Sequence, residues 1–306
     1  MITYWTYENG FTALENIKKN TWISVTNPSP EEIDFLTGKL KVSSEELTDI
    51  LDMDERSRTE TDESWFTIII RIPVAGLHHG MPFSTVPLGI LISNNLIITI
   101  CQVKNEVIPA ILRMKKIDFY NSANFVLYIF LQVADLYMRY LKQINIQVAV
   151  IERDLEKSTK NEELHKLLRM EKCLVYFITS LKSNDILLVK LKNSKFVKST
   201  EIDEDLLEDV IIENRQAIEM ANIYSDIQSG MMDAFASVIS NNLNVVMKQL
   251  ASITIILMIP TFIASLYGMN VPNNFESNRY GFLLIILISL VASAIGVLLF
   301  RKKKWF

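Results

Sequence analysis

Cysteine and histidine are scarce in this sequence, which limits the chemistry that the chain can support. There are two cysteines and three histidines in 306 residues. Cys101 and Cys173 are far apart and form no metal-ligand pattern, so we expect two buried, reduced thiols. His78, His79 and His165 have no partners at a fixed spacing, which argues against a zinc site.

Signatures of enzymes and of nucleic-acid-binding proteins are also missing. The sequence contains no glycine-rich phosphate loop, nucleophile elbow or pair of catalytic acids in a strand–turn–helix context, so an ordinary enzyme is the least favoured class. The net charge of -4 argues against nucleic acid as a partner, because such proteins usually present a basic surface. The N-terminus does not resemble a signal peptide, so we expect most of the chain to stay in the cytoplasm.

Charge is absent from two C-terminal segments, although charged residues make up 22% of the chain. Residues 251–267 and 281–300 contain no charged side chain. Each segment is close to the roughly 20 residues that cross about 30 Å of hydrocarbon. The second segment is apolar all round, whereas a buried core helix normally has a polar stripe. The sequence therefore predicts two transmembrane helices in contact with lipid.

Basic residues gather on one side of these two segments. Lys248 precedes the first segment and residues 301–304 follow the second, whereas the connecting loop, 268–280, carries only Glu276 and Arg279. By the positive-inside rule, both termini are expected in the cytoplasm and the loop outside, as in a two-pass protein of the plasma membrane.

The N-terminal part reads as a mixed α/β domain. Its β-branched runs are too apolar for a surface ribbon, so helices are expected to cover the sheet. Asn94-Asn95 separates the last two runs, as in a hairpin. The expected strands are 22–28, 65–73, 87–93 and 96–103, and the expected helices are 28–40 and 43–52.

Proline and glycine are absent from residues 121 to 229, which favours long helices. One helix is expected over Ser122–Lys157 and a second from Asn161, followed by a polar turn at 192–205. A third is expected over 205–267, where only Gly230 and Pro260 interrupt the helical pattern. Roughly 60 residues at about 1.5 Å each form a rod of roughly 90 Å, which must run from the cytoplasmic domain into the membrane.

The predicted fold class is therefore an α+β membrane protein with an N-terminal α/β domain and a stalk helix of roughly 60 residues that continues into the first of two C-terminal transmembrane helices. The predicted parts are the α/β domain (1–120), a long helical hairpin (121–200), the cytoplasmic part of the stalk helix (201–250), the first transmembrane helix (251–267), the outer loop (268–280), the second transmembrane helix (281–300) and a basic tail (301–306).

Small and polar residues recur at steps of three and four along the stalk helix where it enters the membrane, as in a heptad seam. The seam is either a helix-packing face or the lining of a pore. Because two helices cannot enclose a pore, a channel requires a symmetric oligomer. No charge lies on the seam within the membrane, which suits a hydrated ion, since Mg²⁺ loses its waters reluctantly. The seam is Asn244, Met247, Ala251, Thr254, Met258, Thr261, Ser265 and Gly268.

Tyr267-Gly268-Met269-Asn270 stands at the outer end of the first transmembrane segment. Here the sequence resembles the CorA family of Mg²⁺ channels, which are marked by Gly-Met-Asn just after the first of two C-terminal membrane helices. A tripeptide alone is a weak signal, so the resemblance depends on the position of the triplet at the end of the first membrane segment. The resemblance includes residues 229–248, Pro260 and the basic C-terminus, whereas the first 200 residues share only the general plan.

The resemblance implies a homopentamer that carries Mg²⁺, and often Co²⁺ and Ni²⁺, into the cell. Gly268, Met269 and Asn270 would form the outer mouth. Met247 and Leu250 would form hydrophobic constrictions, which can gate by dewetting. The implied pore-lining residues are Asn244, Met247, Leu250, Ala251, Thr254, Met258, Thr261 and Ser265.

The resemblance also implies regulation by intracellular Mg²⁺ bound between cytoplasmic domains. Counted back from the Gly-Met-Asn triplet without gaps, Asp209 stands at the position of a regulatory acid of the family. Asp203, Asp205 and Glu208 lie close to it in the sequence. Asp54, in an acidic segment with its neighbours, could supply the other half from a second chain. The alternative is that both acidic clusters are solvated surfaces or charge at a helix N-terminus.

Two other functions stay open on the sequence alone. One is a related transporter for Zn²⁺ or Co²⁺ on the same fold. The other is a membrane-tethered sensor that conducts no ion, although a tether needs neither the outer triplet nor the polar seam.

Overall fold

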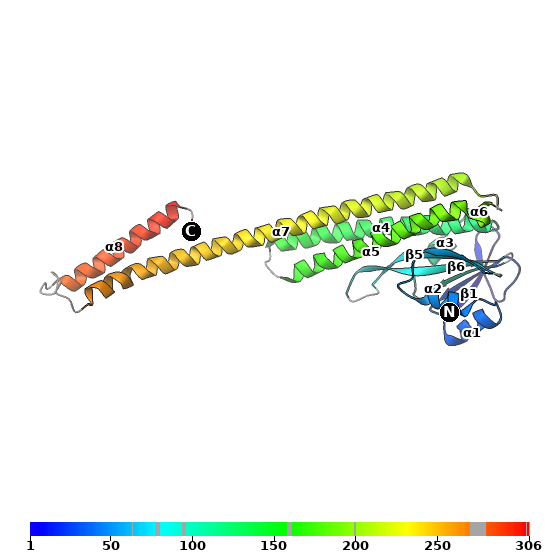
Figure 1. The fold of residues 1–306 in the computed structure, drawn as a ribbon, viewed down its shortest axis with the longest axis horizontal. Coiled ribbons are helices and arrows are strands. Elements are labelled where there is room, and N and C mark those ends of the chain that lie inside the picture. Colours follow the sequence, from blue (N-terminus) through cyan, green and yellow to red (C-terminus); the bar gives the residue numbers. More distant parts are fainter. Residues whose placement is uncertain are drawn as a thin grey trace. The chain divides into compact units, whose positions relative to one another are not determined.

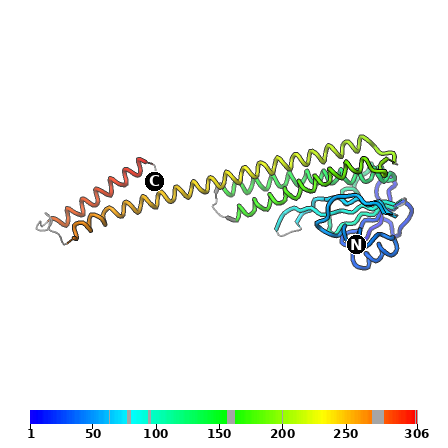
Figure 2. Tube along the Cα trace, viewed as in Figure 1, coloured from blue at the N-terminus to red at the C-terminus, as the bar shows by residue number. Residues whose placement is uncertain are grey.

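The chain forms two compact units, Met1–Ser229 and Gly230–Phe306 (Figures 1 and 2). The structure is a computed structural model that describes residues 1–62, 64–76, 80–93, 96–157, 161–198, 200–269, 280–303 and 305. The predicted turn at Asn94-Asn95 and the pair His78-His79 lie outside the described residues, as does Asn270.

The first unit is built on a mixed sheet. Its strands are β1 (Ile2–Tyr7), β2 (Phe11–Leu14), β3 (Thr21–Thr26), β4 (Arg58–Thr61), β5 (Phe66–Ala75), β6 (Phe83–Ile92) and β7 (Leu96–Cys101). Their order in the sheet is β2-β1-β3-β7-β6-β5-β4. β3 and β7 are parallel, with Trp22 opposite Ile97, and the other neighbouring pairs are antiparallel.

The four predicted strands are confirmed as β3, β5, β6 and β7, and β6 and β7 form the predicted antiparallel pair. β6 begins at Phe83, four residues before the predicted start, and every residue in it is buried. The sequence did not predict β1, β2 and β4, which are half-exposed and form the two edges of the sheet.

Two short helices, α1 (Pro30–Gly38) and α2 (Ser44–Leu51), pack on one face of the sheet. Ser29 caps α1 in a capping box with Glu32, and Ser43 caps α2, so each helix begins where its side-chain cap satisfies free N–H groups. The core on this side contains Ile23, Val25, Leu36, Val42, Leu47, Ile50, Trp65, Ile69, Leu91, Ile98 and Ile100.

Gly89 on β6 allows α2 to approach the sheet closely. A Cβ built at Gly89 would lie 2.6, 2.7 and 2.8 Å from three side-chain atoms of Ile50, which is fully buried. Carbon atoms in contact are normally about 3.5–4.0 Å apart. The position therefore excludes any side chain while Ile50 holds its place.

Long helices cover the other face of the sheet, as the sequence predicted. They are α4 (Ser122–Lys157) and α5 (Asn161–Asn193), with the short α3 (Val107–Leu112) before them and α6 (Lys195–Lys198) after them. α4 and α5 both contact β5 and β6. Rings from the sheet and both helices meet edge to face: Trp22 and Phe125 are 5.2 Å apart, and Tyr137 and Phe177 are 5.1 Å apart.

The stalk helix α7 runs without a break from Glu204 to Tyr267 and so passes from the first unit into the second (Figure 1). In the first unit it is attached to α5 by two buried amides. Asn214 Nδ2 donates to Leu181 O at 3.3 Å, and Gln228 Nε2 donates to Leu167 O at 2.6 Å. The two donors are 14 positions apart on α7, and the two acceptors are 14 positions apart on α5.

The second unit contains the C-terminal part of α7 and the helix α8 (Gly281–Lys302). Both α7 and α8 are long and apolar enough to cross a membrane. The fold class is therefore the predicted one: an α/β domain, long helices, and a stalk helix that continues into the first of two candidate transmembrane helices.

Candidate functional site

The predicted seam on α7 is exposed along its whole length, as far as the outer end of the helix. Asn244, Met247, Leu250, Ala251, Thr254, Met258, Thr261, Ser265, Gly268 and Met269 are all exposed in the single chain. Met247 and Leu250, the predicted constrictions, are 57% and 58% exposed. Large apolar side chains at this level of exposure need a partner, either lipid or protein.

A different face of α7 packs against α8. Ser252 is completely buried, and Ile256 and Ile259 contact the position of Gly296 on α8. A Cβ at Gly296 would lie 3.3 Å from Ile259 Cδ1 and 3.7 Å from Ile256 Cγ1. A small residue at this point lets the two helices approach closely, as is common between transmembrane helices.

The seam points away from α8. Thr254 lies two positions from both Ser252 and Ile256, and successive residues of an α-helix are rotated by about 100°. Thr254 therefore lies about 200° from the α8-facing side, and Thr261 stands in the same relation to Ile259. Because the chain's own second helix does not cover the seam, this face is free to contact other chains or to line a pathway.

The threonine hydroxyls on the seam are oriented by their own helix. Thr254 Oγ1 donates to Leu250 O at 2.9 Å, and Thr261 Oγ1 donates to Leu257 O at 3.2 Å. A hydroxyl that has given its hydrogen to a carbonyl still has lone pairs that accept hydrogen bonds. Both oxygens can therefore accept from water molecules, whose hydrogens point outward in the shell around a cation.

The predicted outer mouth begins where α7 ends. Gly268 N donates to Ala264 O at 2.9 Å, and a Cβ at Gly268 would lie 3.2 Å from that same oxygen. Gly268 and Met269 are exposed. The structure thus places two members of the triplet just beyond the helix, while Asn270, the third, lies outside the described residues.

The predicted regulatory acids on α7 lie in its first turns, and one of them has a structural role. Asp203 Oδ1 accepts from Leu206 N at 3.1 Å, which is the bond of a helix N-cap. Its own N–H donates to Asn124 Oδ1 at 2.9 Å. Asp205, Glu208 and Asp209 are exposed and lie in the same helical segment.

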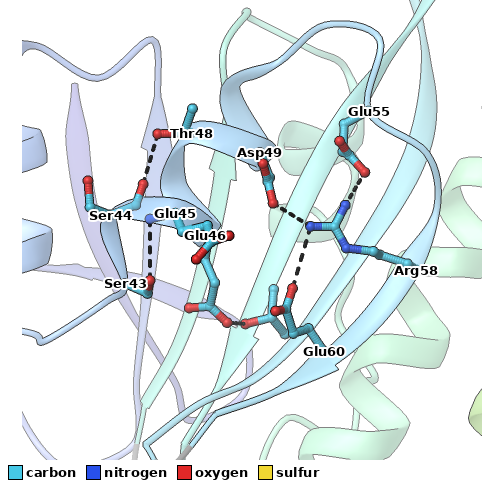
Figure 3. Close-up of polar contacts among 10 residues, drawn as sticks. Ser43, Ser44, Glu45, Glu46, Thr48, Asp49, Glu55, Arg58 and Glu60 are labelled. Atoms are coloured by element: carbon cyan, nitrogen blue, oxygen red, sulfur yellow. Dashed lines mark hydrogen bonds and ion pairs between the residues drawn. The ribbon is translucent and has the colours of Figure 1, made fainter.

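The N-terminal acids form a larger cluster than the sequence indicated (Figure 3). Arg58 donates to Asp49 Oδ2 at 2.6 Å and to Glu60 Oε2 at 3.4 Å, and it also pairs with Glu55. Burial alone would lower the pKa of Arg58, but the hydrogen bond to Asp49 and the charges of the three acids outweigh it and raise that pKa.

Glu46, on α2, is buried beside this cluster. Its Oε1 accepts from Thr67 Oγ1 at 2.9 Å, and its Oε2 has no hydrogen-bond partner among the residues that the structure describes. Burial raises the pKa of Glu46, the bond from Thr67 lowers it, and the charges of Glu60 and Asp62 raise it further. Sequence reasoning missed Glu46, Asp49 and Arg58 as members of a cluster, because they come together only when α2 packs near β4 and β5.

The structure does not bring the two predicted acidic groups together into a metal site. Among the described residues no group of three or more His, Cys, Asp or Glu side chains could hold a metal ion. Asp54 is exposed in the loop after α2, and Asp209 is exposed on α7. The described part of one chain therefore offers no group of three or more such side chains that contains both Asp54 and Asp209.

Comparison with known proteins gives the same family along almost the whole chain. Residues 18–303 match the family model described as CorA-like Mg2+ transporter protein. The chain is 31% identical over 291 residues to the cobalt/magnesium transport protein CorA of Methanocaldococcus jannaschii, covering 93% of this chain and 90% of that one. It is 24% identical over 300 residues to the protein of the same description from Thermotoga maritima, covering 93% and 83%.

Solved structures agree with these sequence matches. The complete structure of the CorA magnesium transporter from M. jannaschii has a TM-score of 0.83 at 27% identity, covering 100% of this chain and 99% of that one. The ZntB cytoplasmic domain from Vibrio parahaemolyticus shares the fold, with a TM-score of 0.58 at 14% identity over 78% of this chain and 98% of that one. The chain therefore belongs to the CorA family of membrane transporters for divalent cations.

Proposed function

We propose that the chain forms a homopentameric channel in the plasma membrane that carries Mg²⁺ into the cell, with Co²⁺ and Ni²⁺ as further cargo. In this proposal the parts keep the boundaries that the sequence predicts, with residues 1–250 in the cytoplasm, helices 251–267 and 281–300 in the membrane, 268–280 outside and 301–306 inside. Both termini are then cytoplasmic, as the basic residues beside the membrane segments favour.

The observation that carries this proposal is the position of the seam on the face of α7 turned away from α8. Thr254 and Thr261 donate their hydroxyl hydrogens within the helix, but lipid would leave the acceptor lone pairs of both oxygens without a donor. A ring of identical α7 helices would turn these side chains toward a common axis and leave α8 on the outside. Such a ring is also a symmetric oligomer, which is required when each chain contributes only one helix to the pore lining.

The seam suits a cation that keeps its water shell. It has no carboxylate within the membrane segment to replace the waters of Mg²⁺, which are removed reluctantly. The acceptor oxygens of Thr254 and Thr261 can bond to the outward-pointing hydrogens of those waters. A negative-inside potential would drive a dication inward with about 4.6 kcal/mol per 100 mV, twice the value for one charge.

In this proposal the triplet Gly268, Met269 and Asn270 forms the outer mouth, and Met247 and Leu250 form apolar rings that close the pore by dewetting. Asn244 forms a polar ring at the cytoplasmic side of these constrictions. The remaining lining residues are Ala251, Thr254, Met258, Thr261 and Ser265.

Regulation by intracellular Mg²⁺ is the second part of the proposal. Asp209, with Asp205 and Glu208, would supply ligands from one chain, and Asp54 would supply them from its neighbour. Carboxylates are the ligands that Mg²⁺ prefers. These acids are exposed, and the described residues of one chain bring no three such ligands together, so occupancy of a site shared by two chains would tie two cytoplasmic domains together.

The test is Mg²⁺ uptake into proteoliposomes that contain a Mg²⁺ dye, under an imposed negative-inside potential. The native chain is compared with Asn270→Ala at the mouth, Thr254→Val on the seam and Ser252→Ala on the α8-facing side. We expect uptake by the native chain and by Ser252→Ala, loss in Asn270→Ala, and a decrease of about three- to tenfold in Thr254→Val, the effect of losing one or two hydrogen bonds.

Three results would contradict the proposal. Absence of Mg²⁺ uptake by folded, oligomeric protein, with uptake of Zn²⁺ or Co²⁺ instead, would assign the chain to another metal. Absence of any cation flux would favour the non-conducting sensor. Equal loss in Thr254→Val and Ser252→Ala would show that the two faces of α7 do not differ in function.

A further inference from the structure

A buried hydrogen-bond network holds the segment that follows α2, residues 52–57, which we call the acidic loop. Its centre is Asn184 on α5, which is completely buried. Asn184 Oδ1 accepts from Ser57 Oγ at 2.7 Å and from Arg71 N at 3.0 Å. Asn184 Nδ2 donates to Arg71 O at 2.8 Å. One side chain of α5 thus binds both the end of the loop and the backbone of β5.

The guanidinium of Arg71 holds the middle of the same loop. Its Nη1 donates to Met53 O and Glu55 O, both at 2.8 Å. Its Nη2 donates to Thr85 O at 2.8 Å and to Thr85 Oγ1 at 2.9 Å. The planar fork of arginine can reach several acceptors in fixed directions, so it fixes the path of the loop against β6.

The arrangement is unusual because a largely buried cation binds neutral oxygens. Among the described residues no carboxylate forms an ion pair with Arg71, although the charges of Asp54, Asp52 and Glu55 lie near it. Burial lowers the pKa of Arg71, and these acids partly offset that effect. Asp52 and Asp54 are exposed, so their carboxylates face solvent and stay available to a ligand.

A loop with several acids would normally be held apart by repulsion between its like charges. Here the loop is fixed from inside by contacts to its backbone, while Glu55 pairs with Arg58 and the side chains of Asp52 and Asp54 stay exposed. Asp52 Oδ1 also accepts from Asp54 N at 3.0 Å, which orders the first turn of the loop. The backbone is therefore pre-organised before any cation binds, and pre-organisation increases affinity.

We propose that Arg71 and Asn184 are positioning residues for the acidic loop, which hold its carboxylates in the arrangement that binds regulatory Mg²⁺. This inference rests on the proposed regulation by Mg²⁺. It assigns a role in cation affinity to two buried residues that do not touch the cation. The two residues are far from the loop in sequence, and they join it to β5, β6 and α5.

The test is a Mg²⁺ titration of the melting temperature of the full chain in detergent. A ligand that binds the folded state raises the melting temperature as its concentration exceeds the dissociation constant. The variants are Asn184→Ala, Ser57→Ala and Arg71→Lys, which keeps the charge but has no fork. Asp54→Asn removes one carboxylate of the acidic loop and so shows how much of the stabilisation by Mg²⁺ depends on that loop.

Asn214→Ala is the matched control, because it also removes a buried asparagine that donates to a backbone carbonyl, but away from the loop. If a residue has a purely structural role, its substitution lowers the melting temperature at every Mg²⁺ concentration and leaves the midpoint of the Mg²⁺ titration unchanged. Ser57→Ala removes a single hydrogen bond and so keeps the test informative if Asn184→Ala does not fold.

We expect the Mg²⁺ midpoint to rise about three- to tenfold in Ser57→Ala, Asn184→Ala and Arg71→Lys, the fold-change of one or two lost hydrogen bonds, and to stay unchanged in Asn214→Ala. Unchanged midpoints in all three loop variants, with a native response that Asp54→Asn reduces, would overturn the positioning role alone. A native chain whose response to Mg²⁺ is the same as that of Asp54→Asn would overturn the proposed regulation, and the positioning role with it.

Discussion

Replacing Gly89 by alanine should destabilise the first unit through a single contact with Ile50. The new methyl group would lie within 2.6–2.8 Å of three Ile50 atoms, about 1 Å closer than normal contact. Ile50 is fully buried and β-branched, so it cannot rotate away easily. Overpacking of this kind costs about 1–3 kcal/mol, and the reduced entropy of the unfolded chain returns about 0.4–1 kcal/mol.

The expected net loss is about 1–2 kcal/mol, which lowers the melting temperature by about 2–8 °C. Tryptophan fluorescence during heating measures it, because Trp22 and Trp65 are buried in this unit. Gly38→Ala is the control: a Cβ at Gly38 meets nothing within 4 Å, so its melting temperature should not fall.

A double-mutant cycle identifies the contact itself. Ile50→Ala removes all three atoms that the new methyl group would meet and on its own should cost about 2–5 kcal/mol. In the double variant the Gly89→Ala methyl group occupies part of the resulting cavity. The double variant should therefore be more stable than the sum of the single effects by at least about 1 kcal/mol. Additive effects within about 0.5 kcal/mol would refute the reasoning, because α2 would then have another way to accommodate a side chain at Gly89.

Two further predictions concern α2 and the membrane part of α7. Because burial raises the pKa of Glu46, this group adds stability below its unfolded pKa and loses it as the pH rises through the folded value. Glu46→Gln, which keeps an acceptor for Thr67, should therefore become increasingly stable relative to the native chain as the pH rises above about 4.3, the usual pKa of glutamate in an unfolded chain; a difference that does not change with pH in thermal melts would contradict this. Thr254→Cys should react with a charged thiol reagent and block uptake, whereas Ser252→Cys, at a fully buried position, should resist it. Because both native cysteines are buried, absence of reaction at Thr254→Cys would show that the seam is not accessible, and equal reaction at the two positions would show that the two faces do not differ.

Local sequence signals predicted most of the fold. The absence of proline and glycine after Asn121 predicted long helices, the helix expected over Ser122–Lys157 has the bounds of α4, and the uncharged segments located the two candidate transmembrane helices. The edge strands β2 and β4, and β1 beside β2, were missed, since half-exposed strands with polar residues lack the apolar runs that indicate a buried strand.

The site was predictable only in part, for a physical reason. Spacing along one helix showed which residues of α7 share a face, because helical geometry is local. It could not show that this face lies opposite α8, which depends on packing around Gly296. Nor could it link Arg71 with Asn184, which are 113 positions apart and meet only in the folded unit.

The two buried amides between α5 and α7 also restrict how this chain can change in length over evolution. Asn214 and Gln228 fit their carbonyl partners only while the intervals between them match on the two helices. An insertion or deletion between Asn214 and Gln228 would misalign one of these bonds and leave a buried amide without its acceptor, unless α5 changed by the same number of residues between Leu167 and Leu181. Relatives with longer or shorter stalks should therefore show paired length changes in these two helices, in steps that keep the same faces together.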